Sequence, residues 1–147
     1  MTIYFYGTRE HPYGCFSNFS RHGFELDGIW WPTSEHYFQA QKFVTTDSAW
    51  FEKIQTAKTP KEAAKMGRSR AHPLRDDWEQ VKDEIMYFGL VQKFATHEEL
   101  QQILLNTKDE AIVENSPIDY YWGCGKDGTG KNRLGEILMR VRETLRS

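Results

Sequence analysis

Residues 30–43 read WWPTSEHYFQAQKF, and the rest of the chain is interpreted around them. Thr33 or Ser34 can cap the first free amides of a helix, and the run that follows contains no helix breaker. At 100° per residue, the spacing predicts a core stripe on one face of this helix. That stripe comprises Tyr37, Ala40 and Val44.

The opposite face of the predicted helix is polar and is flanked by aromatic rings. It carries Glu35, Gln39 and Lys42, with Phe38 and Phe43 on either side. A solvated face seldom has phenylalanine on both sides of a carboxylate, so the arrangement suits a lined pocket. The alternative is that the aromatic residues are core and that the macrodipole favours Glu35 in a first turn. A helix N-terminus lowers the pKa of a carboxyl and aromatic surroundings raise it, so an anionic role and a proton-transfer role both stay open.

The composition is that of a globular domain. The 147 residues are 39% hydrophobic and 14% aromatic, and a chain of this length can bury a full core. The five Trp, seven Tyr and nine Phe exceed what packing needs, so we expect some rings to line a site for planar ligands. We predict a single domain over residues 1–147.

Charge and cysteine content narrow the function classes. The net charge of −2 argues against nucleic-acid backbone as the main partner. Cys15 and Cys124 form no CxxC pair and no disulfide framework, which favours a reducing cytosol. No secretion signal pattern and no apolar run of about 18 residues is found. We therefore expect a cytoplasmic protein without a membrane segment, and the pattern indicates no oligomeric state.

Outside residues 30–43, the sequence predicts short strands and several helices. Strands are expected at 3–6, 111–114 and 120–122, with a hairpin at 24–30 that turns at Asp27-Gly28. Helices are expected at 47–57, 59–67, 77–95, 97–106 and 130–146. Because these elements do not alternate as βαβα, we predict a compact α+β fold that is mostly helical with a small sheet.

Residues 123–128 match G-x-G-x-x-G, and residues 125–131 match GxxxxGK. The first motif requires a βαβ unit with a later acidic residue, and only one predicted helix follows here. The second requires Ser or Thr after its lysine, and residue 132 is Asn. We reject both assignments. Glycines beside a helix start, together with Lys126, Lys131 and Arg133, still favour an anion.

Other polar residues have two interpretations each. Asp119, before Tyr121 and Trp122, is site-like beside aromatic rings, and equally suits a turn after Pro117. Arg68, in the basic run 58–75, is either part of a solvated face or a phosphate clamp. The five histidines include no HExxH and no i, i+4 pair, so we expect no metal site.

Several segments together resemble the NADAR superfamily and, within it, the YbiA-like branch. They are FYG at 5–7, FSNF at 16–19, WPTSEHYFQAQKF at 31–43, GR at 67–68, DYYWG at 119–123 and NRLG at 132–135. The resemblance extends from about residue 3 to residue 143, nearly the whole chain. The central helix motif and the closing D-x-x-W-G…G-x-N-x-L-G motif are specific as a set.

The resemblance implies a metal-independent N-glycosidase that needs no cofactor. YbiA-like members are linked to hydrolysis of the N-glycosidic bond of early riboflavin-pathway intermediates, which are ribosylamino-pyrimidines with a 5′-phosphate. Other branches are linked to ADP-ribose, including its removal from guanine in nucleic acid. By motif position, the functional carboxylates fall on Glu35 and Asp119, and the pocket aromatics on Trp78 and Trp122.

Our hypothesis from the sequence is hydrolysis at C1′ of a small phosphorylated ribosylamine. One carboxylate stabilises an oxocarbenium-like centre and the other positions water, without assignment of which does which. Trp78 and Trp122 would stack the pyrimidine. Lys42 and Arg68 would hold the phosphate.

We also place Asn18, Gly123 and Asn132 in the substrate-binding set. Two alternatives stay open. One is an ADP-ribosyl glycohydrolase acting on modified guanine, the only case in which nucleic acid would be a partner. The other is a module that binds ADP-ribose or NAD without cleaving it.

Overall fold

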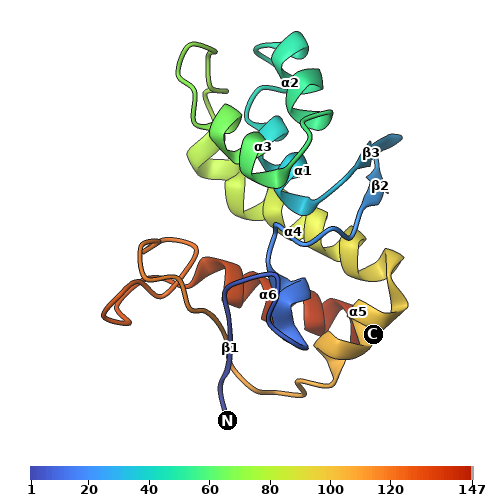
Figure 1. Cartoon of the computed structure of the whole chain (residues 1–147), viewed down its shortest axis with the longest axis vertical. Helices are drawn as coiled ribbons and strands as arrows, with labels where there is room; N and C mark the ends of the chain where they lie inside the picture. Colours follow the sequence, from blue (N-terminus) through green and yellow to red (C-terminus); the bar gives the residue numbers. More distant parts are fainter. Residues whose placement is uncertain (147) are drawn as a thin grey trace.

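The computed structural model describes residues 1–146, and within them it contains six α-helices, one short 3-10 helix and four strands (Figure 1). The strands are β1 (Ile3–Phe5), β2 (Phe24–Leu26), β3 (Ile29–Trp31) and β4 (Ile112–Glu114). The helices are η1 (Tyr13–Phe16), α1 (Ser34–Gln41), α2 (Ser48–Gln55), α3 (Pro60–Gly67), α4 (Trp78–Thr96), α5 (Glu98–Leu105) and α6 (Arg133–Arg146). The predicted α+β class is confirmed.

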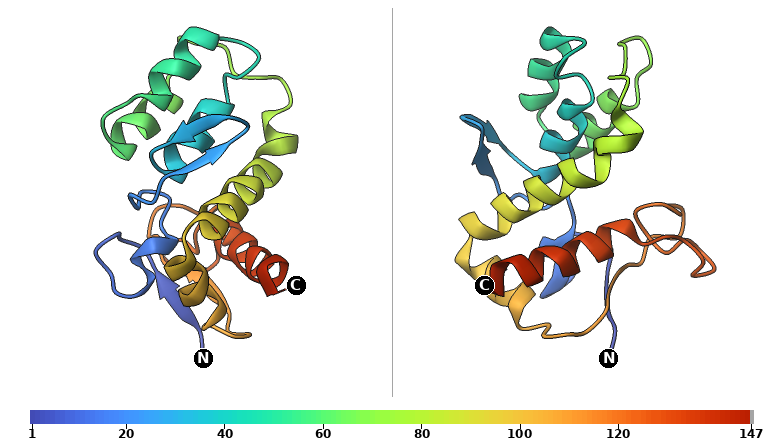
Figure 2. Two further views of the ribbon diagram at one scale, coloured as in Figure 1. Left: turned by 90° about the vertical axis from the view of Figure 1, so that its right-hand side faces the viewer. Right: turned by 180° about the vertical axis from the view of Figure 1, so that it is seen from behind.

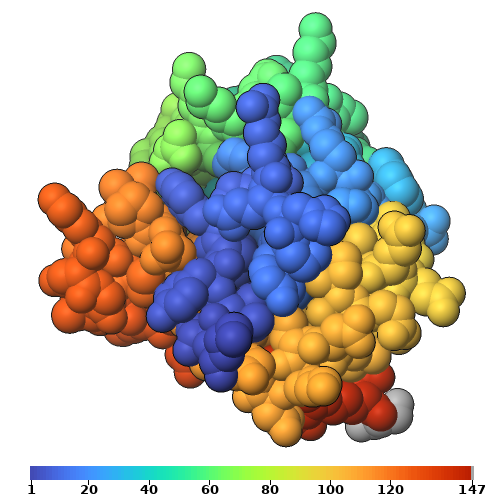
Figure 3. All heavy atoms as spheres, turned by 60° about the horizontal axis from the view of Figure 1, so that its bottom comes forward, coloured from blue at the N-terminus to red at the C-terminus, as the bar shows by residue number. Residues whose placement is uncertain are grey.

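The strands form two separate pairs. β2 and β3 are antiparallel and turn at Asp27-Gly28, whose φ angles of 55° and 79° suit the predicted hairpin turn. β1 lies parallel to β4, with Phe5 opposite Glu114. Figure 3 shows the consequence: the blue N-terminal segment lies between the orange loop before α6 and the yellow α4–α5 region.

α1 is a buried helix whose start agrees with its sequence signal. The Thr33 side chain accepts the backbone N–H of His36 at 3.1 Å, and residues 34–40 are all buried. The helix packs against α2, α3 and α4, so it has almost no solvated face. Tyr37 and Ala40 belong to the core as expected.

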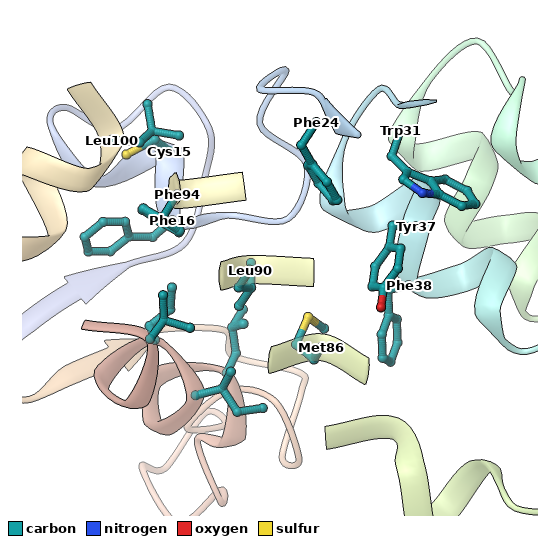
Figure 4. Packing of buried hydrophobic residues seen from close by; sticks show 14 of the residues in the cluster. Cys15, Phe16, Phe24, Trp31, Tyr37, Phe38, Met86, Leu90, Phe94 and Leu100 are labelled. Carbon is teal, nitrogen blue, oxygen red and sulfur yellow. The ribbon is translucent and has the colours of Figure 1, made fainter. Parts of the chain in front are cut away.

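α4 connects the two halves of the molecule. On one side of it lie α1, α2, α3 and the β2–β3 hairpin, and on the other lie β1, β4 and α6, which packs along it (Figures 1 and 2). Figure 4 shows Met86 and Leu90 of α4 between two groups of buried rings, one around Phe16 and Phe94 and the other around Tyr37. One continuous core therefore holds both halves together.

Three details of the prediction are wrong. Val44 is 40% exposed, because α1 ends at Gln41 and the turn that follows rotates it away from the core. Residues 120–122 form no strand, since Asp119 holds the next amides in a turn. α6 begins at Arg133 rather than at residue 130, after Asn132 with φ of 53°.

None of the helices in the described part of the chain is long and apolar enough to cross a membrane.

Candidate active site

The polar face of α1 borders a cavity between the two halves of the molecule. Glu35, Gln39 and Lys42 line this cavity, whose volume is about 450 Å³ and suits a small metabolite. The other walls come from the loop after η1, the end of α3, the first turns of α4 and residues 114–122. A larger depression of about 590 Å³ beside α5 contains none of the predicted site residues. The pocket expected from the face opposite the core stripe is therefore present.

Asn18 connects the loop after η1 to the start of α1. Its side-chain oxygen accepts the Ser34 hydroxyl at 2.8 Å, and its backbone oxygen accepts the N–H of Glu35 at 3.0 Å. Its amide nitrogen lies 3.4 Å from the sulfur of Met86. Asn18 lines the cavity, and its hydrogen bonds orient the helix that carries Glu35.

Glu35 is a buried residue of the cavity lining, and its neighbours shift the pKa of its carboxyl in opposite directions. Burial raises the pKa of its carboxyl above the usual value, and the hydrogen bond from Gln39 (2.7 Å) opposes that rise. The cations of Lys42 and Arg68 also lower this pKa, whereas Asp119 raises it. Burial is the largest of these effects, so the net result is a pKa above the usual value, and not the lowered pKa that a helix N-terminus alone would give.

Lys42 and Arg68 approach the cavity from different depths. The Lys42 ammonium is buried, donates to the Gly67 carbonyl at 3.3 Å, and lies 5.8 Å from the ring centre of Trp78. Burial, followed by the neighbouring Arg70, lowers the pKa of Lys42 to about 8, while Glu35 opposes that shift. Arg68 is exposed at the end of α3. Of these two cations, Lys42 therefore lies inside the cavity and Arg68 at its edge.

Asp119 fulfils both interpretations that the sequence allowed. Its Oδ1 accepts the backbone N–H groups of Tyr121 and Trp122 at 2.9 and 2.8 Å, which makes it a turn residue. It also lines the cavity. The two amide donors therefore fix the position of this carboxyl group at the cavity wall.

Three aromatic rings form one wall. The Phe38 ring lies 5.0 Å from that of Trp78 and 5.3 Å from that of Trp122, centre to centre. All three residues line the cavity. Trp78 is only 5% exposed and Trp122 is half-buried, so Trp122 leaves more of its surface open to a ligand.

A NADAR domain profile matches residues 4–146. The chain belongs to the NADAR family. An N-glycosidase of Nostoc punctiforme is 51% identical over 100% of this chain and 94% of that protein. The N-glycosidase YbiA of Escherichia coli strain K12 is 50% identical over 97% of this chain and 88% of that protein. The solved NMR structure of the E. coli protein YbiA superposes with a TM-score of 0.90 at 49% identity, covering 99% of this chain and 84% of that one.

A plant relative of this NADAR chain is named for riboflavin biosynthesis. The chloroplastic riboflavin biosynthesis protein PYRR of Zea mays is 41% identical over 97% of this chain, which matches 25% of that longer protein. NADAR sequence is thus found both alone and inside a larger protein.

Two members of the predicted substrate-binding set, Asn132 and Gly123, are not among the residues that line the cavity. Asn132 donates to the Ile112 carbonyl and accepts the N–H of Glu114, both at 2.9 Å. Gly123 packs against Glu114 and Ser116. Both residues support β4 and the segment after it, and direct contact with a substrate stays a prediction for both.

Sequence reasoning missed two charged residues of the cavity. Lys82 lies on α4, one turn beyond Trp78, and nothing in its local pattern distinguishes it from a solvated lysine. Glu114 ends β4, where its place before the Asn-Ser-Pro turn was the available signal. Burial, then Asp119 and Glu35, raise the pKa of Glu114 to about 7.

Proposed function

We propose that this NADAR protein is an N-glycosidase that hydrolyses the bond between C1′ and the base nitrogen of ribosylamino-pyrimidine 5′-phosphates. The observation that carries the proposal is the position of Glu35 at the base of a cavity that also has an aromatic wall and cations. The chain is 51% and 50% identical, over nearly its whole length, to two proteins named N-glycosidases, and this supports the reaction class. The riboflavin relative supports the choice of substrate.

The charges of the cavity suit a phosphorylated sugar. Arg68 and Lys82 line it from α3 and α4, and a planar guanidinium at the edge can hold a phosphate through two hydrogen bonds. Lys42, deeper inside, lies between Glu35 and the aromatic wall. We assign phosphate binding to Arg68 and Lys82, with Lys42 closer to the ribose.

The reaction develops positive charge at C1′ as the base departs. A carboxylate beside that carbon stabilises the charge, and a second carboxylate can orient the attacking water. We assign the first role to Glu35, because the Gln39 amide and the cations of Lys42 and Arg68 favour its ionised form against the effect of burial. We assign the second role to Asp119, which two backbone amides keep in place. Water adds its hydroxyl to C1′, and the base leaves with a proton.

The test is an incubation with the early riboflavin intermediates and, in parallel, with ADP-ribosylated guanosine. Released ribose 5-phosphate or ADP-ribose is followed by mass spectrometry. We expect ribose 5-phosphate from the wild type and a fall in kcat of about 100- to 1,000-fold in Glu35→Gln, as for loss of one transition-state electrostatic contact. Glu52→Gln, on the exposed face of α2, is the matched control and should match the wild type.

The outcomes separate the candidate functions. Release of ADP-ribose alone would assign the same cavity to the other branch of the family. Tight binding of ADP-ribose without any cleavage would favour the binding module. Full activity of Glu35→Gln would refute the role given to Glu35.

A further inference from the structure

Glu114 is a third carboxyl group at the cavity, and it differs from the other two in having no hydrogen-bond donor. Glu35 receives the Gln39 amide, and Asp119 receives two backbone N–H groups. The Oε2 atom of Glu114 is fully buried and has no partner among the described residues. An ionised oxygen without a donor is costly inside a protein, whereas a protonated carboxyl is tolerated.

Gly123, Asn132 and Cys124 fix the position of Glu114. A Cβ on Gly123 would lie 2.9 Å from Oε2, so the glycine leaves the space that the carboxyl occupies. The Asn132 side chain accepts the Glu114 N–H and donates to the Ile112 carbonyl, both at 2.9 Å. The N–H of Cys124 donates to the Glu114 carbonyl at 2.9 Å. The backbone of Glu114 is therefore fixed from two sides.

The charges around Glu114 favour its neutral form. Burial is the largest cause of its raised pKa of about 7, and Asp119 and Glu35 add to it. The remaining charged side chains that line the cavity are Lys42, Arg68 and Lys82. Lys42 and Arg68 act on Glu35, and neither lowers the pKa of Glu114. Near neutral pH, Glu114 is thus a carboxyl that retains a transferable proton.

We propose that Glu114 is a catalytic residue: the general acid that protonates the departing base nitrogen. This inference rests on the proposed N-glycosidase function. As the bond between C1′ and nitrogen breaks, its electron pair goes to nitrogen, and the Glu114 O–H supplies the proton. Water then bonds to C1′ and gives its own proton to Asp119, and exchange with solvent restores both carboxyls. Three His, Cys, Asp or Glu side chains placed to share a metal ion are not found in residues 1–146, so Glu114 is not accounted for as a ligand.

The first experiment compares the wild type with Glu114→Gln on the ribosylamino-pyrimidine 5′-phosphate. Glutamine keeps the size of the side chain and cannot transfer the proton. We expect kcat to fall by about 100- to 10,000-fold, the range for loss of a general acid. In the wild type, kcat should decline as pH rises above about 7, where Glu114 ionises. This alkaline limb should be absent from the variant, in which a decline should begin only near pH 8, as Lys42 loses its proton. Glu52→Gln should keep both the rate and the limb.

A second measurement tests the protonation directly and needs no turnover. The infrared difference between wild type and Glu114→Gln at pH 5 should contain the carbonyl band of an un-ionised carboxylic acid, and this band should fade through pH 7. Absence of the band at pH 6 would overturn the proposal even if no substrate were cleaved. An active wild type whose Glu114→Gln variant has the same kcat and pH profile would overturn it while leaving the N-glycosidase function standing. A wild type that cleaves nothing would instead reject the proposed function.

Discussion

Replacement of Gly123 by alanine should move the Glu114 carboxyl without altering its chemistry. The added Cβ would lie 2.9 Å from Glu114 Oε2, 2.9 Å from Ser116 Cβ and 3.0 Å from the Glu114 carbonyl oxygen. The two latter atoms belong to a hydrogen-bonded turn, because the Ser116 hydroxyl accepts the N–H of Asp119 at 3.1 Å and the Glu114 carbonyl accepts that of Cys124. The end of the Glu114 side chain is therefore the atom group that yields most easily.

The contacts set the expected size of the effect. Oε2 must retreat about half an ångström to reach ordinary contact, and misplacement of a reacting group by about 1 Å can cost about 100-fold in rate. We therefore expect Gly123→Ala to lower kcat by about 10- to 100-fold. Overpacking costs about 1–3 kcal/mol. For a chain of 147 residues, this corresponds to a fall in Tm of about 3–10 °C.

The assay is ribose 5-phosphate release with Tm measured on the same samples, and Gly7→Ala is the matched control. A Cβ on Gly7 meets no atom within 4 Å, so that variant should retain kcat and Tm. If Gly123→Ala lost stability and kept kcat within about twofold of the wild type, the placement of Glu114 would not matter to the reaction. An equal loss of kcat in Gly7→Ala would show that the effect is not specific to the contact between residue 123 and Glu114.

Three further variants, two at Asp119 and one at Lys93, test a charge of the site and a buried charge of the fold. Asp119→Asn keeps the oxygen that accepts two backbone N–H groups, so its kcat should fall while its Tm matches that of the wild type. Asp119→Ala loses that oxygen, so thermal unfolding should also find a loss of about 1 kcal/mol of stability. Lys93 is fully buried, donates to the carbonyls of Cys15 and Ser17, and has a pKa lowered to about 7 by burial. Because the unfolded chain binds this proton more tightly, the free energy of unfolding should rise by roughly 2 kcal/mol between pH 7 and pH 9, and urea titration should find that rise absent in Lys93→Met.

The sequence was sufficient for α1 and its polar face because their signals are local. Thr33 caps the helix, and the 3.6-residue period places Glu35, Gln39 and Lys42 together. The local pattern left Asp119 with two interpretations, and its selection as a functional carboxylate came from the family resemblance. These predictions required no knowledge of how the two halves of the chain meet.

The rest depends on tertiary pairing that no local pattern contains. Glu114 borders the cavity because β4 lies beside β1, and the two strands are more than 100 residues apart in the sequence. Gly123 and Asn132 lie in a motif that suggested substrate contact, but their contacts are with Glu114 and Ile112. A motif identifies residues that a site requires; it does not distinguish those that touch the ligand from those that hold another residue in place.

The two halves of the fold contribute different sets of charged groups to the cavity. One contributes a carboxyl group with two cations, and the other contributes two carboxyl groups. Glu35 comes from α1 on the side that also supplies Lys42 and Arg68, so the anion best balanced by cations is the one suited to stabilise C1′. Glu114 ends β4 and Asp119 lies in the turn that follows, where the Ser116 hydroxyl accepts the Asp119 N–H. Asp119 accepts two backbone N–H groups, whereas the buried Oε2 of Glu114 has no donor within residues 1–146. Burial, followed by the neighbouring Asp119 and Glu35, raises the pKa of Glu114 to about 7. Because Glu114 and Asp119 both lie within residues 114–119 and Glu35 comes from α1, the roles that we propose divide between the two halves of the fold: proton donor and water-orienting group on one, stabilisation of C1′ on the other.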